Sequence, residues 1–265
     1  MNAVIFRFLW RRHRLTILLC SIAPILVGVM IGFIYPSYSK QRALLQTFKI
    51  AGRFFGGEQV DLFSAAGAFT LPFQHPIVLA LFGVAAGCPV IALPAGERGR
   101  RGLDLLLAAP LERRTLMVSL LAFVLSASPL IASACAVGAL AGATIAGEAQ
   151  NLPFATYFLL VVNAFGLLVC LAGLGAVLSA IAEDRAQMTT WYAASVFLAM
   201  ALDVAARLWQ SQSWIGYLGP YGYFRPAEAV ARGGSGIGAD IAVLLSAAGL
   251  AFAAATFVMS RRRSA

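Results

Sequence analysis

Long apolar runs separated by short polar stretches set the pattern of this chain. An α-helix rises about 1.5 Å per residue, so roughly 20 apolar residues cross the hydrocarbon core of a bilayer, which is about 30 Å thick. Six runs reach that length: 15–35, 76–94, 116–146, 152–181, 188–208 and 237–260. The pattern predicts an all-α, polytopic membrane protein in which residues 1–265 form one transmembrane domain.

Shorter segments precede, join and follow these runs. Residues 1–14 place Arg7, Arg11 and Arg14 on one stripe of a helix, and we expect an opposing surface of Val4, Ile5, Phe8 and Leu9. Such an amphipathic helix lies in the membrane interface, and contact with a cytoplasmic partner is the alternative. The other segments are an outer one at 36–75 with interfacial phenylalanines, a re-entrant outer one at 209–236 and a tail at 261–265.

Charge adds the orientation of the chain. The sequence is 60% hydrophobic and 12% charged, with a net charge of +9. Arginines in short loops stay on the cytoplasmic side, and most basic residues fall there when both termini are cytoplasmic. We therefore expect a bacterial plasma (inner) membrane protein with both termini inside. Because the basic residues are split among short loops, they favour contact with anionic lipid headgroups over nucleic-acid binding.

The sequence lacks the common motifs of nucleotide-binding proteins, serine hydrolases and zinc proteases. It contains no G-x-x-x-x-G-K-[S/T] loop, no G-x-S-x-G elbow and no H-E-x-x-H pair. His13 and His75 lie far apart, and the first four runs hold one cysteine each: Cys20, Cys88, Cys135 and Cys170. We expect a chain that is not an enzyme and that binds no metal or cofactor, with any chemistry left to another subunit.

Three runs carry small residues every fourth position, a spacing that lets helices approach closely in lipid. This pattern fits packing within the chain, and a dimer face is the alternative. The positions are Ala134, Gly138, Gly142 and Ala146; Ala172, Ala176 and Ala180; and Ala247, Ala251 and Ala255.

One acid stands out inside a run. Asp203 lies near the outer end of the fifth run, and Arg207 follows one helical turn later. This spacing favours an i,i+4 ion pair. A contact with substrate is the alternative.

A dense island of charge separates the second and third runs. Arginines and acids flank the apolar turn Leu105–Leu107, a composition that suits a short helix pressed between the membrane and a soluble partner. Its candidate coupling residues are Glu97, Arg101, Gly102, Asp104, Leu106, Leu107, Pro110 and Arg113. A second short cytoplasmic loop holds Glu183, Asp184 and Arg185.

The island resembles a motif of permease subunits of ABC-2-type transporters, in which Glu97, Asp104, Leu105–Leu107, Pro110 and Arg113 match at the same spacing. The segment GPYGYFRPAEAVARGG looks like the outer segment of that family, with Pro220, Tyr223, Phe224 and Pro226 as lid residues. Two positions depart from the pattern: Arg101 stands at the usual glycine, with Gly102 one place later, and Leu120 stands at a common lysine.

The resemblance implies a six-helix ABC-2-like (type V) exporter fold and specific partners. A second permease copy, identical or different, pairs with this chain, and two copies of a separate cytoplasmic ATPase bind ATP and Mg. Residues 97–114 act as a coupling helix, and the two outer segments cover a central cavity. The implied cargo is hydrophobic or amphipathic, of the drug, lipid, peptide or polysaccharide class.

Two other functions stay open at this point. A mechanical or assembly permease would drive a periplasmic maturation partner without moving cargo, and it favours a larger outer domain than the roughly 40 residues of 36–75. An enzyme embedded in the membrane requires polar residues clustered at one depth, and the runs contain no such cluster.

Overall fold

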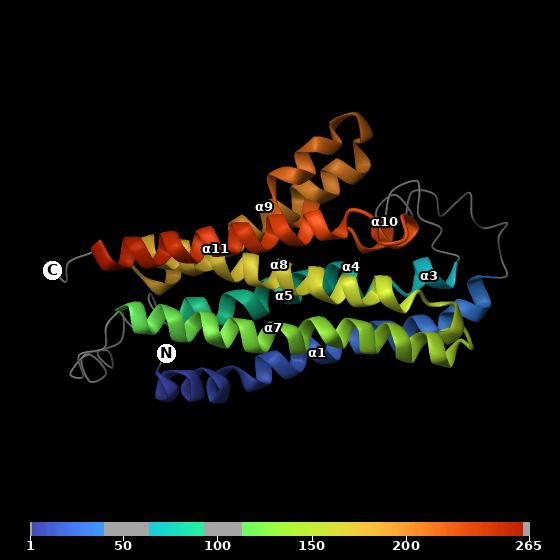
Figure 1. Ribbon diagram of the computed structural model, residues 1–265, viewed down its shortest axis with the longest axis horizontal. Helices are drawn as coiled ribbons and strands as arrows, with labels where there is room; N and C mark the ends of the chain where they lie inside the picture. Colours follow the sequence, from blue (N-terminus) through green and yellow to red (C-terminus); the bar gives the residue numbers. More distant parts are fainter. Residues whose placement is uncertain (1, 40–63, 93–112, 262–265) are drawn as a thin grey trace.

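The computed structural model describes residues 2–39, 64–92 and 113–261, in which every element is a helix (Figure 1). The first half contains α1 (Ala3–Tyr38), α3 (Ala65–Ala68), α4 (Leu71–Gln74), α5 (Pro76–Val90), α7 (Arg113–Ile145) and the 3₁₀ turn η3 (Ala149–Asn151). The second half contains α8 (Phe154–Ile181), α9 (Arg185–Leu208), the 3₁₀ segments η4 (Gln210–Leu218) and η5 (Pro220–Tyr223), α10 (Pro226–Ala231) and α11 (Ile237–Arg261).

Six helical segments are long and apolar enough to cross a membrane: α1, the segment Ala65–Val90, α7, α8, α9 and α11. They run along the long axis of the molecule, and the start of α1 and the end of α11 lie toward the same end of that axis (Figure 1). The prediction of an all-α chain with six membrane-crossing helices is therefore confirmed for the described residues.

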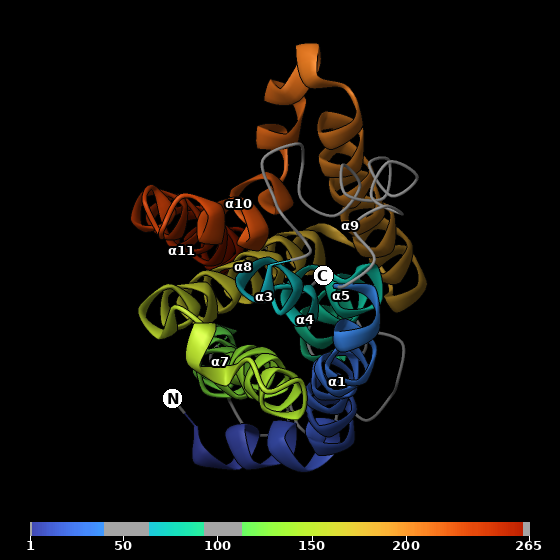
Figure 2. The ribbon, with the colours of Figure 1, turned by 90° about the vertical axis from the view of Figure 1, so that its right-hand side faces the viewer.

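The first helix differs from the expected division at residue 14. The chain has no helix breaker around Arg14, and α1 continues from the N-terminal turns into the first span. Its first turns cross one side of the bundle before the helix turns along the axis (Figure 2). The expected apolar surface is also divided, because Ile5 and Leu9 are buried whereas Val4 and Phe8 are exposed.

The second span begins earlier than the apolar run. Ser64 caps α3 by accepting a hydrogen bond from the Gly67 N–H at 3.1 Å, and α4 leads directly into α5. Phe69, which follows α3, and Phe73 of α4 are fully buried, so they belong to the core and not to an interfacial helix of an outer segment.

Glycines set the closest helix crossing, between α1 and α7. Gly28 and Gly32 of α1 face Gly138 and Gly142 of α7, and a Cβ on any of the four would collide with the backbone of the other helix. In the absence of a hydrophobic drive between helices in lipid, such close backbone contact supplies the attraction. Gly138 and Gly142, two of the four small residues in the third run, thus pack within the chain.

Packing between α8 and α11 follows the same rule. A Cβ on Gly173 would lie 3.1 Å from the Ala251 Cβ and 3.2 Å from the Ala248 carbonyl oxygen. Ala172, Ala176, Ala180 and Ala255 are fully buried in the core.

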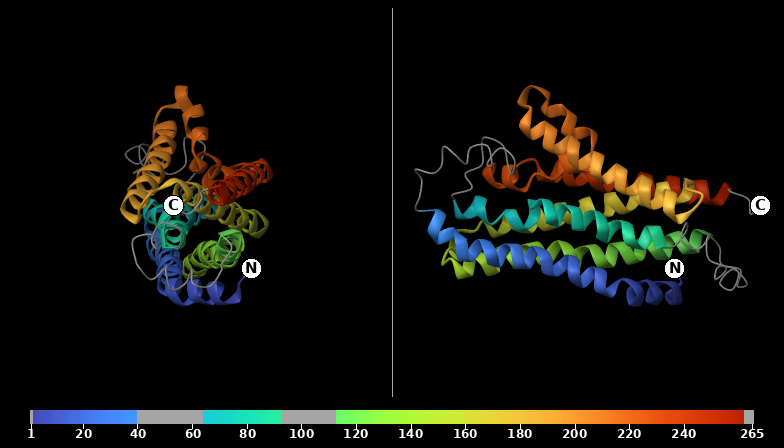
Figure 3. Two further views of the ribbon diagram at one scale, coloured as in Figure 1. Left: turned by 90° about the vertical axis from the view of Figure 1, so that its left-hand side faces the viewer. Right: turned by 180° about the vertical axis from the view of Figure 1, so that it is seen from behind.

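The fifth span, α9, leaves the bundle toward its C-terminal end. With η4 it forms a hairpin that projects sideways from the other helices (Figures 2 and 3). Near the start of α9 the Tyr192 hydroxyl donates a hydrogen bond to the Gly83 carbonyl at 2.9 Å. The Tyr192 ring also contacts the position of a Cβ on Gly87, so only glycine leaves room for it. One end of α9 therefore packs on α5 through Tyr192, while the other end carries the hairpin.

Candidate functional site

Asp203 anchors a buried ionic network where α9 meets the outer segment. Its side chain is 4% exposed, and both Nε and Nη2 of Arg207 lie 2.8 Å from Oδ2. Asp203 and Arg207 thus form the i,i+4 ion pair that their spacing in the sequence favours. A role for either residue in transport is a prediction.

A second arginine joins this pair to α10. Arg225 places Nε 4.0 Å from Oδ1 of Asp203 and Nη1 3.5 Å from Oε1 of Glu228. Its guanidinium also lies over the Tyr217 ring, 4.8 Å from the centroid. Arg225 therefore connects α9, η4 and α10 through one side chain.

The edge of the network is formed by Arg232, whose Nη2 lies 3.3 Å from Oε2 of Glu228. This side chain is 55% exposed, and an exposed pair of this kind contributes little to stability. The buried part of the network is therefore centred on Asp203 and Arg225.

Glycines make the space that Arg225 occupies. A Cβ on Gly216 would lie 2.8 Å from Nη2 of Arg225 and 3.0 Å from the Ala206 Cβ. Close by, a Cβ on Gly219 would lie 3.2 Å from the Ala199 Cβ. The outer segment thus rests on α9 at two glycine contacts, with the ionic network beside them.

Some atoms of the network lack a hydrogen-bond partner among the described residues. They are Oδ1 of Asp203 and Nε and Nη2 of Arg225. The 4.0 Å between Oδ1 and Nε is too long for a direct hydrogen bond. The network is therefore held by charge and has spare hydrogen-bonding capacity.

The predicted lid residues lie in and next to this network. Phe224 is buried with its ring 6.3 Å from that of Phe82, and the Tyr223 carbonyl accepts a hydrogen bond from Nδ2 of Asn163 at 3.2 Å. Pro220 and Pro226 occupy the first turns of η5 and α10, where proline is well tolerated.

Tyr221, between these prolines, ties η5 to the second span. Its hydroxyl lies 3.3 Å from the Leu79 carbonyl of α5, to which it donates a hydrogen bond. Burial, together with the Asp203 carboxylate, raises the pKa of the Tyr221 hydroxyl. The hydroxyl therefore keeps the proton that this hydrogen bond needs.

The loop at 183–185, which the sequence predicts to be cytoplasmic, has a local structural role. Oδ1 of Asp184 accepts a hydrogen bond from the Gln187 N–H at 2.8 Å, and Oε1 of Gln187 accepts one from the Glu183 N–H at 2.7 Å. This reciprocal arrangement caps the start of α9. The side chains of Glu183, Asp184 and Arg185 are exposed, so they are also free to contact a partner.

The candidate coupling residues fall almost entirely outside the described residues. Glu97, Arg101, Gly102, Asp104, Leu106, Leu107 and Pro110 lie in 93–112, and Arg113 is the first residue of α7. The coupling assignment therefore stays a prediction from the sequence.

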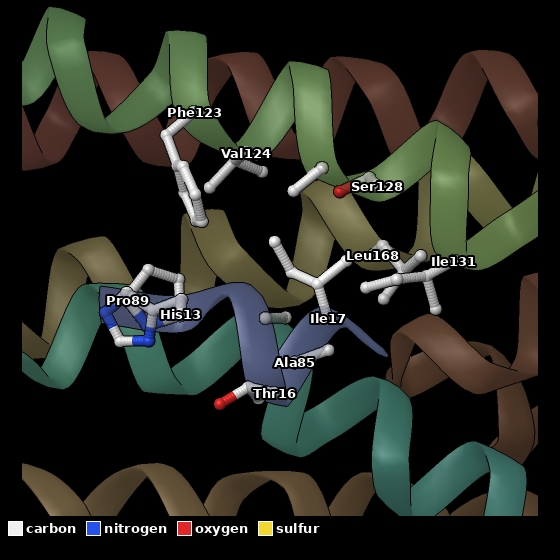
Figure 4. Close-up of a pocket in the computed structure, with 12 residues that line it drawn as sticks. His13, Thr16, Ile17, Ala85, Pro89, Phe123, Val124, Ser128, Ile131 and Leu168 are labelled. Carbon is white, nitrogen blue, oxygen red and sulfur yellow. The ribbon is translucent and has the colours of Figure 1, made fainter. Parts of the chain in front are cut away.

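A small pocket lies between α1, α5, α7 and α8 (Figure 4). It is lined by His13, Phe123, Ser128 and other side chains, and Nε2 of His13 has no hydrogen-bond partner among the described residues. The free volume is about 10 Å³, close to the least that one water molecule needs. A drug-sized ligand needs hundreds of Å³, so this pocket is no cargo site in the present conformation.

Sequence reasoning found Asp203 and Arg207 but missed Arg225 as their third partner. The segment FRPAE places Arg225 three residues before Glu228, and this spacing was the available signal. Its contact with Asp203 depends on the fold, because 21 residues lie between Asp203 and Arg225 along the chain.

Comparison with known proteins identifies a family for this chain. Residues 5–254 match the family described as "Multidrug efflux system permease Rv1217c, C-terminal domain". No curated protein and no solved structure matches the chain. The matched range begins in the first turns of α1 and ends within α11, so it covers the four middle candidate spans and most of the first and the last.

Proposed function

Because the chain belongs to the family of the C-terminal domain of the multidrug efflux system permease Rv1217c, we propose that it is the membrane-spanning permease of an efflux transporter. The family match over residues 5–254 carries this proposal. Six helices that can cross a membrane support it, because a permease moves its cargo between such helices.

The proposed energy source is a separate ATPase. The sequence has no P-loop, so ATP and Mg bind to the partner, which is present in two copies. In this scheme the permease is of the ABC-2 type and pairs with a second copy, identical or different. Residues 97–114 form the coupling helix, and the exposed loop at Glu183, Asp184 and Arg185 is a second contact.

The proposed cargo is an amphipathic, drug-like molecule. The printed description of the family names multidrug efflux, and the exposed side chains of α9 are largely apolar. A cavity shared with the second copy would accept such molecules, whereas the pocket at His13 is too small.

The experiment compares three variants in vesicles that contain the chain and its ATPase. Leu106→Asp places a charge in the apolar contact, and Glu97→Arg reverses a charge that orients the segment. We expect both variants to be expressed and to lose ATPase capture or dye efflux, by tenfold or more if a buried leucine contact worth about 2 kcal/mol is lost.

Arg98→Ala is the matched control within the same segment, and it should lower efflux only slightly. If Leu106→Asp and Glu97→Arg both behave like the wild type, the island is only a membrane-side anchor. If the complex hydrolyses ATP normally but exports no amphipathic dye, drug export is wrong and a mechanical role gains support.

A further inference from the structure

The exposed face of α1 changes its chemistry at Leu15. Before this residue the face carries Val4 and Phe8 together with the arginines at positions 7, 11, 12 and 14. From Leu15 onward it is apolar, and the large exposed side chains are Leu18, Leu19, Ile22, Leu26, Met30 and Phe33. Within a membrane-crossing helix, an exposed apolar face of this length contacts lipid chains. The arginines lie on the continuation of this face toward the N-terminus of α1.

The opposite face fixes the orientation of these first turns. Leu9 is fully buried, and the Trp10 ring packs edge-on against Phe123 of α7 with 5.6 Å between centroids. At the start of the helix, the Asn2 N–H donates a hydrogen bond to Oγ of Ser119 at 3.0 Å. Because this face is docked on α7, the arginine face cannot turn inward.

The arginines carry charge that the described protein does not neutralise. None of the four forms an ion pair with a described residue, and Arg12 lies over the Phe8 ring at 5.6 Å. The sequence contains no acid before Glu58. Guanidinium groups that form no ion pair among the described residues, at the end of a lipid-facing surface, favour an anion at that depth.

We propose that Arg7, Arg11, Arg12 and Arg14, the arginine row, bind the phosphate groups of anionic phospholipids in the leaflet on the N-terminal side. A guanidinium group binds phosphate through two parallel hydrogen bonds. Val4 and Phe8 lie on the same face and insert between the headgroups, as the apolar side chains of interfacial helices do. The direct continuity with the lipid-facing part of α1 favours lipid over a soluble protein partner.

The main experiment measures bound lipid directly, without ATPase or transport, and capture of the ATPase is assayed separately. The full chain is purified in mild detergent with equal amounts of phosphatidylglycerol and phosphatidylcholine, and co-purified lipid is quantified by mass spectrometry. Each basic residue near an anionic surface contributes about a fivefold preference. We expect the wild type to retain mainly phosphatidylglycerol, and Arg7→Gln/Arg11→Gln/Arg14→Gln to lose the preference by on the order of 100-fold.

Two further variants serve as controls. Arg7→Lys/Arg11→Lys/Arg14→Lys keeps the charge and should keep most of the preference. Arg232→Gln removes an exposed arginine on α10 and should leave it unchanged. A wild type without preference, or a glutamine variant that keeps it, would overturn the proposal. So would a glutamine variant that keeps its lipid and loses ATPase capture, because the row would then be a protein contact.

Discussion

At the residue scale, Asp203 and Arg225 hold the outer segment against α9. Burying a charge is costly unless a partner compensates it, and Asp203 has Arg207 on its own helix and Arg225 across the chain. Arg225 in turn needs the space left by Gly216. These contacts bring three separate stretches of sequence to one point, so a change at any of them should affect the others.

Removal of the Asp203 carboxylate tests this network. Asp203→Ala strands two arginines in a buried place, and we expect it to lower stability by about 3 kcal/mol, measured as thermal unfolding in detergent. Asp203→Ala/Arg207→Ala should recover part of the loss, because one stranded charge is gone. Asp184→Ala, which removes only an exposed helix cap, is the control and should cost about 1 kcal/mol. Normal stability with abolished transport would instead indicate a substrate contact.

At the element scale, the helix pairs differ in how closely their backbones approach each other. The α1–α7 and α8–α11 pairs meet at glycines and alanines and have no room for larger side chains. The contact of α9 with the bundle is different, because it depends on Tyr192 near one end and on the outer segment near the other. The α9–η4 hairpin is therefore the element most suited to move as a unit.

The glycine crossing can be tested with one methyl group. A Cβ on Gly138 would contact Pro24 O and lie 2.9 Å from the Ile25 Cα, both backbone atoms that cannot rotate away. Gly138→Ala should destabilise the chain by about 1–3 kcal/mol. Gly249→Ala is the matched control, since no atom lies within 4 Å of its Cβ position, and it should be neutral or slightly stabilising. Equal melting temperatures for the two variants would contradict the close crossing.

Engineered disulfides test whether the hairpin moves as a unit. After removal of the native cysteines, Ala199→Cys/Gly219→Cys should join η4–η5 to α9, because the two Cβ positions lie 3.2 Å apart. Since these parts are expected to move together, dye efflux should persist when this bond forms. Gly83→Cys/Val196→Cys instead links α5 to α9, where the Cβ position on Gly83 lies 2.9 Å from Cγ1 of Val196.

The second bond should block efflux, and a reducing agent should restore it. Efflux that survives the α5–α9 bond would show that α9 does not move against α5. Efflux lost on forming the 199–219 bond would show that the outer segment moves separately, as a lid.

The sequence was most informative where one physical requirement decides the structure. A bilayer demands long apolar helices, so the six spans followed from the apolar runs. In the structure α5 begins at Pro76, the first residue of its run, whereas α9 begins at Arg185, three residues before its run, because Asp184 caps it there. The helices α3 and α4 were not predicted, because Gly67, Pro72 and His75 are typical of a loop. In the structure, burial of Phe69 and Phe73 stabilises these two helices against the bundle. Arg225 was missed because its partner depends on the fold.

At the scale of the whole molecule, the chain is a helical membrane protein whose sequence contains no P-loop. Its described helices form one apolar core, and its exposed polar positions lie mainly near the ends of the helices. As the proposed permease, it would respond to a partner that pushes at residues 97–114, with α9 as the movable element.

Purification of the isolated chain tests this division of labour. Because the sequence has no P-loop, we expect no ATP binding and no hydrolysis above background. After mild detergent extraction from the native membrane, an ATPase should co-purify in an equal number of copies. Tight ATP binding by the chain alone would contradict the proposed function.

The α1–α7 crossing also has a consequence for biosynthesis. When α1 enters the membrane, the helix with which it makes its most extensive contact has not yet been made. At about 5–20 residues per second, synthesis from the end of α1 to the end of α7 takes roughly 5–20 s. During this interval the Gly28 and Gly32 surface is open to lipid or to membrane chaperones. A nascent chain arrested before residue 113 should therefore hold α1 loosely, and one arrested after α7 has left the translocon should hold it firmly.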